Sequence, residues 1–307
     1  MAKSISKILS YPAGINMKNL LMMFILILTA QIYTQSDYSK ELEKGINLFN
    51  EEKFDEAKEI FETILEDSDD LAEAHYYLAK CLFNLGELDD AIEHGEKAVE
   101  LEDKNAEYHF DLGMMYAEDA RDASFFRAPF IAGDIKEQFE RTVELDPDHL
   151  QGRIGLAQFY LQAPGIAGGD VDKALEQSEI VFTMDERQGR ILLFQVYNQQ
   201  EKFIKAEDEL KIIEENFGDD PEFYNFYNSY GYFLLNRGRV DEAIEKFKKQ
   251  VSLAPEEANP YDSLGEAYRI KGMLAESLKE YQKAYSISPS DRVEEIIEEL
   301  EEELFNN

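Results

Sequence analysis

Histidine is the side chain in this sequence best suited to bind a metal or to move a proton near neutral pH. The chain has four histidines, of which His75 and His109 are separated by 34 residues, and the others are His94 and His149. Repeat register alone places one residue type at the same point of two successive 34-residue units. We therefore predict that His75 and His109 pack between helices and do not bind a metal.

Other sequence patterns for catalysis are absent. No HExxH, GxxxxGK[ST] or GxSxG motif occurs, and Gly168-Gly169 lacks the strand-turn-helix context of a phosphate loop. The single cysteine, Cys81, excludes an internal disulfide and a thiolate metal cluster. Carboxylates are so frequent that a pair of them identifies nothing. The sequence therefore predicts no enzymatic activity, no catalytic residue, no metal and no cofactor.

The excess of acidic over basic residues limits the kinds of molecule that the protein is expected to bind. The chain has 31 Lys and Arg residues against 65 Asp and Glu residues, so its formal net charge is −34. Nucleic-acid binding requires basic patches that neutralise phosphates. We therefore expect no nucleic-acid partner, and we read most of the acidic residues as a solvated surface.

One stretch, Ala72–Asn105, shows how the elements are arranged. Its small, apolar and turn residues fit two short amphipathic helices joined at Gly86, with Ala79 and Ala91 allowing close helix contact. This pattern resembles the tetratricopeptide repeat, a 34-residue helix-turn-helix. The resemblance implies an all-α fold, a right-handed α-solenoid that acts as a binding scaffold for protein partners.

The 34-residue template fits seven consecutive segments. These segments are residues 38–71, 72–105, 106–149, 150–186, 187–220, 224–257 and 258–291. The fifth segment is weaker because Phe194 replaces the usual small residue. Residues 292–307 place apolar side chains on one helical face and seven glutamates elsewhere. We predict a solubilising C-terminal capping helix there, with an acidic interaction tail as the alternative.

The third repeat contains about ten extra residues by template counting, and its second helix is expected to start near Gly133. The inserted segment 123–132 contains Phe125, Phe126 and Phe130, where a plain loop would be polar. This segment either packs against the array or forms an exposed docking knob.

The fourth repeat contains the loop Ala163–Asp170, in which one proline and three glycines prevent a continuous helix. With the insertion before it, this loop resembles a block found in some bacterial exported tetratricopeptide proteins, with the pattern APGIxGG. The resemblance covers residues 106–185 and brings no established activity.

The first 36 residues contain three lysines and no acid, and Leu20–Ala30 is an apolar run of eleven residues. This pattern is typical of a signal peptide and is short for a membrane span. We expect export to the periplasm or the exterior, with cleavage after Ala30 or near Gln35. Met17 is an alternative start, and an uncleaved inner-membrane anchor is the alternative outcome.

The resemblance also implies that the first helix of each repeat lines a concave groove. Eleven of the twenty groove positions in repeats four to seven are Asn or Gln, whereas the whole chain has 27 of these residues. Carboxamides both donate and accept hydrogen bonds, so they can pair with a peptide main chain. The alternative is that they only fill solvent-facing positions.

We therefore predict a scaffold that captures an extended polypeptide in this groove. The predicted main-chain partners are Gln158, Gln195, Asn198, Asn228 and Asn236, and the predicted apolar anchors are Tyr76, Phe83 and Tyr232. A structural subunit of an envelope complex, assembling through its outer face and residues 123–132, is the alternative. A clamp for the C-terminal carboxylate of a chaperone is not expected, because Lys80 and Arg269 are the only bases at these positions and lie five repeats apart.

Overall fold

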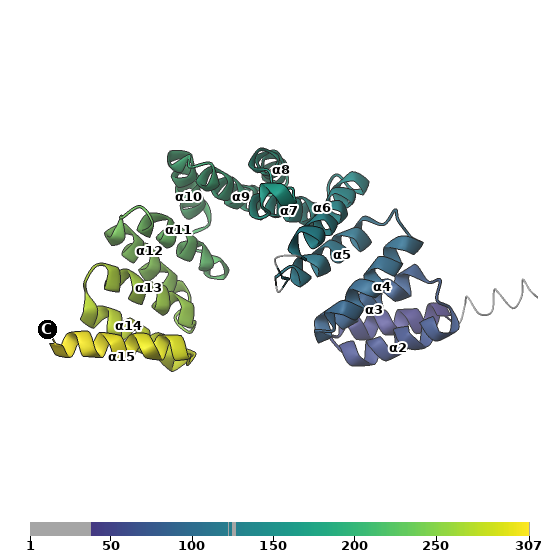
Figure 1. The fold of residues 1–307 in the computed structure, drawn as a ribbon, viewed down its shortest axis with the longest axis horizontal. Helices are drawn as coiled ribbons and strands as arrows, with labels where there is room; N and C mark the ends of the chain where they lie inside the picture. Colours follow the sequence, from purple (N-terminus) through teal and green to yellow (C-terminus); the bar gives the residue numbers. More distant parts are fainter. Residues whose placement is uncertain (1–37, 122, 125–126, 307) are drawn as a thin grey trace, which may run out of the picture. The chain divides into compact units, whose positions relative to one another are not determined.

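The computed structural model describes residues 38–121, 123–124 and 127–306. These residues form helices joined by short turns, and the all-α prediction is confirmed. The chain divides after Gly169 into two compact units, which we call the N-terminal unit and the C-terminal unit. Within each unit, most successive helices pack as neighbours (Figure 1).

The N-terminal unit begins with the helical residues 38–50. It continues with α2 (Phe54–Asp67), α3 (Ala72–Leu85), α4 (Leu88–Leu101), α5 (Ala106–Asp119), α6 (Ala128–Leu145), α7 (Leu150–Gln162) and the 3-10 helix η1 (Gly165–Ala167).

The C-terminal unit begins inside the fourth predicted repeat, so α8 packs against α9. Its helices are α8 (Val171–Met184), α9 (Glu186–Gln199), α10 (Phe203–Phe217), the 3-10 helix η2 (Pro221–Phe223), α11 (Asn225–Leu235), α12 (Val240–Leu253), α13 (Ala258–Ile270), α14 (Leu274–Ile287) and α15 (Asp291–Asn306).

One contact recurs inside the helix pairs: a glycine of the first helix faces an aromatic ring of the second. A Cβ atom on Gly45 would lie 2.7 Å from the Phe61 ring, and one on Gly265 would lie 3.0 Å from the Tyr281 ring. The Phe61 ring is fully buried. The missing side chain therefore lets the ring seat against the backbone of the facing helix, which fixes how closely the two helices pack.

The same contact gives the length of the insertion in the third repeat. Gly113 faces Phe139, 26 positions later, whereas Gly45 and Phe61 are 16 positions apart. The difference is the ten residues expected from the template. The expected start of the second helix near Gly133 is wrong, because α6 begins at Ala128. Pro129 favours this early start, since its missing N–H costs nothing in the first turn of a helix.

The loop before α8 depends on its two adjacent glycines. Gly168 has a φ of 99°, and a Cβ atom on Gly169 would overlap the carbonyl of Ala163. The amide groups of Ala167 and Gly169 both donate to the Pro164 carbonyl, at 2.8 and 3.1 Å. The loop is therefore a defined turn, and a larger side chain at either glycine position would strain it.

The C-terminal unit ends in the predicted cap. Helix α15 lies along α14 (Figure 1), and its Val293 and Leu300 are buried beside Tyr281. Leu304, which the sequence pattern assigns to the same apolar face, is 37% exposed at the end of the helix. The apolar face therefore covers α14, and the glutamates of α15 face solvent.

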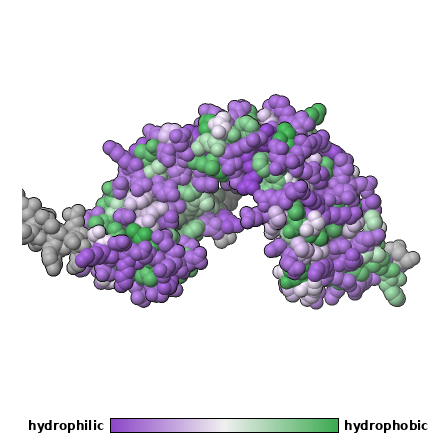
Figure 2. All heavy atoms as spheres, turned by 180° about the vertical axis from the view of Figure 1, so that it is seen from behind, coloured by the Kyte–Doolittle hydropathy of each residue, from purple (hydrophilic) through white to green (hydrophobic). Residues whose placement is uncertain are grey.

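On the face seen in Figure 2, hydrophilic residues cover most of the surface of each unit, and apolar residues appear as small separate patches. None of the described helices combines the length and apolar character needed to cross a membrane. The expected export signal at residues 1–36 lies outside the described residues and stays a prediction.

We expect Gly189→Ala to destabilise the C-terminal unit. A Cβ atom there would overlap the backbone of Phe182, so α8 and α9 would have to separate. Overpacking of this kind costs about 1–3 kcal/mol. Urea unfolding followed by circular dichroism measures this loss.

The matched control is Gly133→Ala in α6. Gly133 is exposed, and a Cβ atom there would meet nothing within 4 Å. Ala is favoured over Gly in a helix by about 1 kcal/mol, so this variant should be as stable as the wild type or more so. Equal stability of the Gly189→Ala variant and the wild type would contradict the close α8–α9 packing.

Candidate functional site

A cleft with a volume of about 190 Å³ lies in the C-terminal unit, between α9, α10 and α11. It occurs at the repeat in which Phe194 replaces the usual small residue. The residue 16 positions after Phe194 is Leu210, so this helix pair lacks the glycine-ring contact that Gly231 makes with Phe247 in the next pair. Both side chains line the cleft instead.

The floor of the cleft is apolar. Its side chains are Ile191, Phe194, Leu210, Ile213, Phe223 and Phe226.

Two of these rings stack on each other, and one of them also contacts an arginine outside the cleft. Phe223 stacks on Phe226 at a centroid distance of 5.2 Å, and Arg187 lies over the Phe223 ring at 5.4 Å. Arg187 is itself held by Asp220 at 3.1 Å. The floor is therefore preformed, because charged neighbours set the position of the Phe223 ring.

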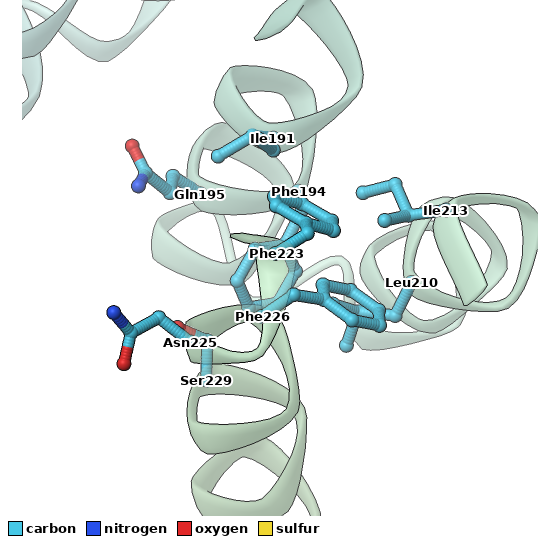
Figure 3. Close-up of a pocket in the computed structure, with 9 residues that line it drawn as sticks. All are labelled: Ile191, Phe194, Gln195, Leu210, Ile213, Phe223, Asn225, Phe226 and Ser229. Carbon is cyan, nitrogen blue, oxygen red and sulfur yellow. The ribbon is translucent and has the colours of Figure 1, made fainter. Parts of the chain in front are cut away.

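The rim of the cleft is polar. Gln195 of α9 and Asn225 of α11 extend their carboxamides to the same side, away from the aromatic rings, and Ser229 lies beside them (Figure 3). All three residues are exposed. The arrangement joins an apolar cavity to a pair of solvent-facing amides that can both donate and accept hydrogen bonds.

Three other predicted site residues of the C-terminal unit already have internal partners. The Oδ1 atom of Asn198 accepts from Arg237 at 2.9 Å. The Oδ1 atom of Asn228 accepts from the buried hydroxyl of Ser263 at 2.8 Å. This bond ties α11 to α13, so Asn228 has a structural role.

Tyr232 and Asn236 lie further along α11. The Tyr232 hydroxyl donates to Glu266 at 2.6 Å. Burial and this hydrogen bond raise the pKa of Tyr232 to about 12, so its hydroxyl stays a donor at neutral pH. Asn236 is exposed at the end of α11. Tyr232 therefore braces α13, and Asn236 stays a predicted ligand contact.

The N-terminal unit contains the remaining predicted residues. Tyr76 is only 7% exposed, and its hydroxyl donates to Asp111 at 2.6 Å while the Lys80 ammonium lies over its ring. Its ring therefore packs inside the unit, and its role as an anchor stays a prediction. Phe83 is half-buried against the core, and Gln158 is exposed.

Comparison with known families agrees with the helix pairs. Models described as tetratricopeptide repeats match residues 48–112 and 258–291. A model described as YpiA-like, C-terminal tetratricopeptide repeats matches residues 192–257. The chain is a tetratricopeptide repeat protein. Proteins built from this repeat are scaffolds that bind other proteins and are typically not enzymes. None of the curated proteins matches the chain.

Solved structures share the fold of this tetratricopeptide repeat protein. A tetratricopeptide repeat protein from Parabacteroides merdae aligns with a TM-score of 0.67 at 14% identity, over 86% of this chain and 96% of that one. PilF of Pseudomonas aeruginosa gives 0.53 at 15%, over 72% and 94%. A chain of the APC/C hetero-tetramer Cut9-Hcn1 gives 0.51 at 19%, over 85% of this chain but 48% of that one. At these identities the likeness establishes the fold alone.

The repeats also explain two of the histidines. The fourth residue of four repeats bonds to the main-chain oxygen six residues before it, in the loop that leads from the preceding repeat. The four pairs are His75 with Asp69, His109 with Asp103, Arg153 with Pro147, and Tyr261 with Pro255. His75 and His109 are buried at 6% and 3% exposure. We call these bonds the loop ties.

Among the described residues, no group of three or more His, Cys, Asp or Glu side chains is arranged to hold a metal ion. Cys81 is fully buried, and burial raises the pKa of its thiol to about 12. The thiol is therefore protonated and unreactive at neutral pH.

Of the residues in the inserted segment, Phe125 and Phe126 lie outside the described residues. Phe130 is 76% exposed, and the next residue, Ile131, is buried. A docking role for this segment stays a prediction.

His75 also contacts His94 of α4, with 2.8 Å between their Nδ1 atoms. A carbonyl oxygen can only accept, so Nε2 of His75 carries a proton toward Asp69, and Nδ1 of neutral His75 accepts from His94. In the next repeat Gln138 occupies the position of His94 and bonds to His109 at 2.7 Å. Burial, and then the neighbouring His75, lower the pKa of His94.

We expect the N-terminal unit to lose stability as the pH falls below about 6.5. The folded pKa of His94 is depressed, so an unfolded histidine, with its ordinary pKa of about 6.5, binds the proton more readily. The stabilisation is complete above pH 6.5 and is lost as the pH falls toward the folded pKa. Urea midpoints between pH 5 and pH 8 measure it.

The matched variant is His94→Gln, which introduces the residue type found at this position in the next repeat. The NH2 group of its amide can donate to His75 and does not titrate, so the stability of the variant should fall less between pH 6.5 and pH 5 than that of the wild type. Parallel pH profiles for the two proteins would show that the histidine pair does not contribute.

Proposed function

We propose that this tetratricopeptide repeat protein binds an extended segment of a partner protein at the cleft between α9 and α11. One observation carries the proposal: apolar side chains and the amides of Gln195 and Asn225 line the same cleft (Figure 3). An apolar side chain of the ligand would enter the cleft while its main chain crosses the two amides. The cleft would contact one side chain of the ligand, and the amides would contact its main chain. This combination suits an extended peptide.

The size of the cleft supports a side chain as its occupant. Sites for metabolites and drug-sized ligands have volumes of about 300–1,000 Å³, whereas this cleft has about 190 Å³. Burial of a leucine or phenylalanine side chain contributes about 1.5–3 kcal/mol. Each hydrogen bond to a carboxamide adds about 0.5–1.5 kcal/mol. Burial in the cleft therefore supplies most of the binding free energy, and the hydrogen bonds at the rim fix the position of the peptide main chain.

We expect labelled decapeptides with a central Leu in a Gly/Ser background to bind at least tenfold more tightly than the same peptides with a central Ala. The difference is the free energy of burying the Leu side chain in the cleft. Ser229→Leu, which places a side chain across the mouth of the cleft, should abolish this preference. Fluorescence anisotropy with the full chain measures both affinities.

The rim is tested separately with the double variant Gln195→Ala/Asn225→Ala. Loss of two hydrogen bonds should weaken binding of the Leu peptide about tenfold while the preference for Leu over Ala persists. The control is Gln282→Ala on α14, away from the cleft, which should bind like the wild type. Equal binding of Leu and Ala peptides to the wild type would refute the proposed cleft.

A further inference from the structure

Arg237 follows α11, beyond the cleft, and its guanidinium is held between two aromatic rings. The distance from Cζ to the ring centroid is 3.9 Å for Phe203 and 3.7 Å for Phe233. Two hydrogen bonds also hold it: one Nη donates to the Phe233 carbonyl at 2.7 Å, and the other donates to Asn198 at 2.9 Å. We call this arrangement of Phe203, Phe233 and Asn198 around Arg237 the guanidinium seat. The group is therefore fixed in orientation, with the Asn198 bond at the surface.

This cation lacks an acidic partner. Within the described part of the chain, no carboxylate oxygen lies within 4 Å of Arg237, and its buried Nε has no hydrogen-bond partner. Arg239, two residues later, pairs with both Glu207 and Glu242, at 2.7 and 2.6 Å. Burial lowers the pKa of Arg237. A partly desolvated guanidinium that no carboxylate contacts is costly, so a carboxylate that reached it would stabilise it.

The position of Arg237 relates to the cleft by helix geometry. Asn198 follows the rim residue Gln195 by three residues, and Phe233 follows Ser229 by four. At a rise of 1.5 Å per residue, the guanidinium seat lies about 5–6 Å further along the two helices. Alternate side chains of an extended peptide lie on one face and are about 6.6 Å apart. The cleft and the seat therefore match residues i and i+2 of one ligand.

We propose that Arg237 and Asn198 form a carboxylate subsite, and that the bound peptide has an acidic side chain two residues from the apolar side chain in the cleft. The inference rests on the proposed function and specifies its ligand. Each Nη atom carries two N–H groups, and the bonds to Phe233 and Asn198 use one of each, so the guanidinium retains N–H groups that can donate to a carboxylate. When the acidic side chain of the ligand binds, its carboxylate would replace Asn198 as the acceptor of the Arg237 hydrogen bond or would accept beside it.

The test compares four decapeptides in one Gly/Ser background: Leu-Gly-Glu, Leu-Gly-Gln, and the two reversed orders. We expect the Glu peptide to bind at least tenfold more tightly than the matching Gln peptide in one order, which also gives the direction of the ligand. The gain should shrink in high salt. It should vanish in Arg237→Gln and be reduced in Arg237→Lys, which keeps the charge but lacks the planar fork.

The matched control is Lys202→Gln, which removes an exposed positive charge near the start of α10 and should leave the preference for Glu intact. Loss of the preference in this control would assign it to diffuse charge and overturn the subsite. Equal binding of the Glu and Gln peptides to the wild type would overturn the subsite while the cleft stands. Loss of the Leu preference as well would overturn both proposals. Urea unfolding checks each variant, and if Arg237→Gln unfolds, Arg237→Lys and the salt dependence decide.

Discussion

The contact between a glycine and an aromatic ring is the constraint on which four of the helix pairs depend. Where Gly231 lies under Phe247, the ring presses against the backbone of the facing helix and is fully buried. A side chain at the glycine would push the helices apart, and a smaller residue at the ring would leave a void. The pairs that share this contact therefore bring their two helices together in the same way.

The candidate site lies where this constraint is relaxed. Phe194 occupies the small-residue position and Leu210 the ring position, so the aromatic ring of this pair is on the first helix and not on the second. The extra turn η2 then adds Phe223 to the space between α9 and α11. A regular repeat would fill this space with its own core. The irregular one leaves an apolar cavity that opens to solvent beside two amides.

Periodicity explains how much could be predicted. The spacing of Gly, Ala and aromatic residues identifies the helix pairs, since each position has one packing role in every repeat. It also locates Gln195 at the cleft. The partners of polar side chains could not be predicted, because the bonds of Asn228 to Ser263 and of Tyr76 to Asp111 join residues about one repeat apart. Arg237 lies one position beyond the groove positions, and only the packing of two rings around it reveals it.

The loop ties have a consequence for how such an array changes over time. Four of the joints between successive repeats are held by one side chain that bonds to a main-chain oxygen, and His75, Arg153 and Tyr261 are among the residues that perform this role. The acceptor is the same whatever the loop sequence, so the donor can be exchanged by a single codon without disturbing either core. Evolution can therefore adjust the stiffness of the array joint by joint while the helix pairs stay constant.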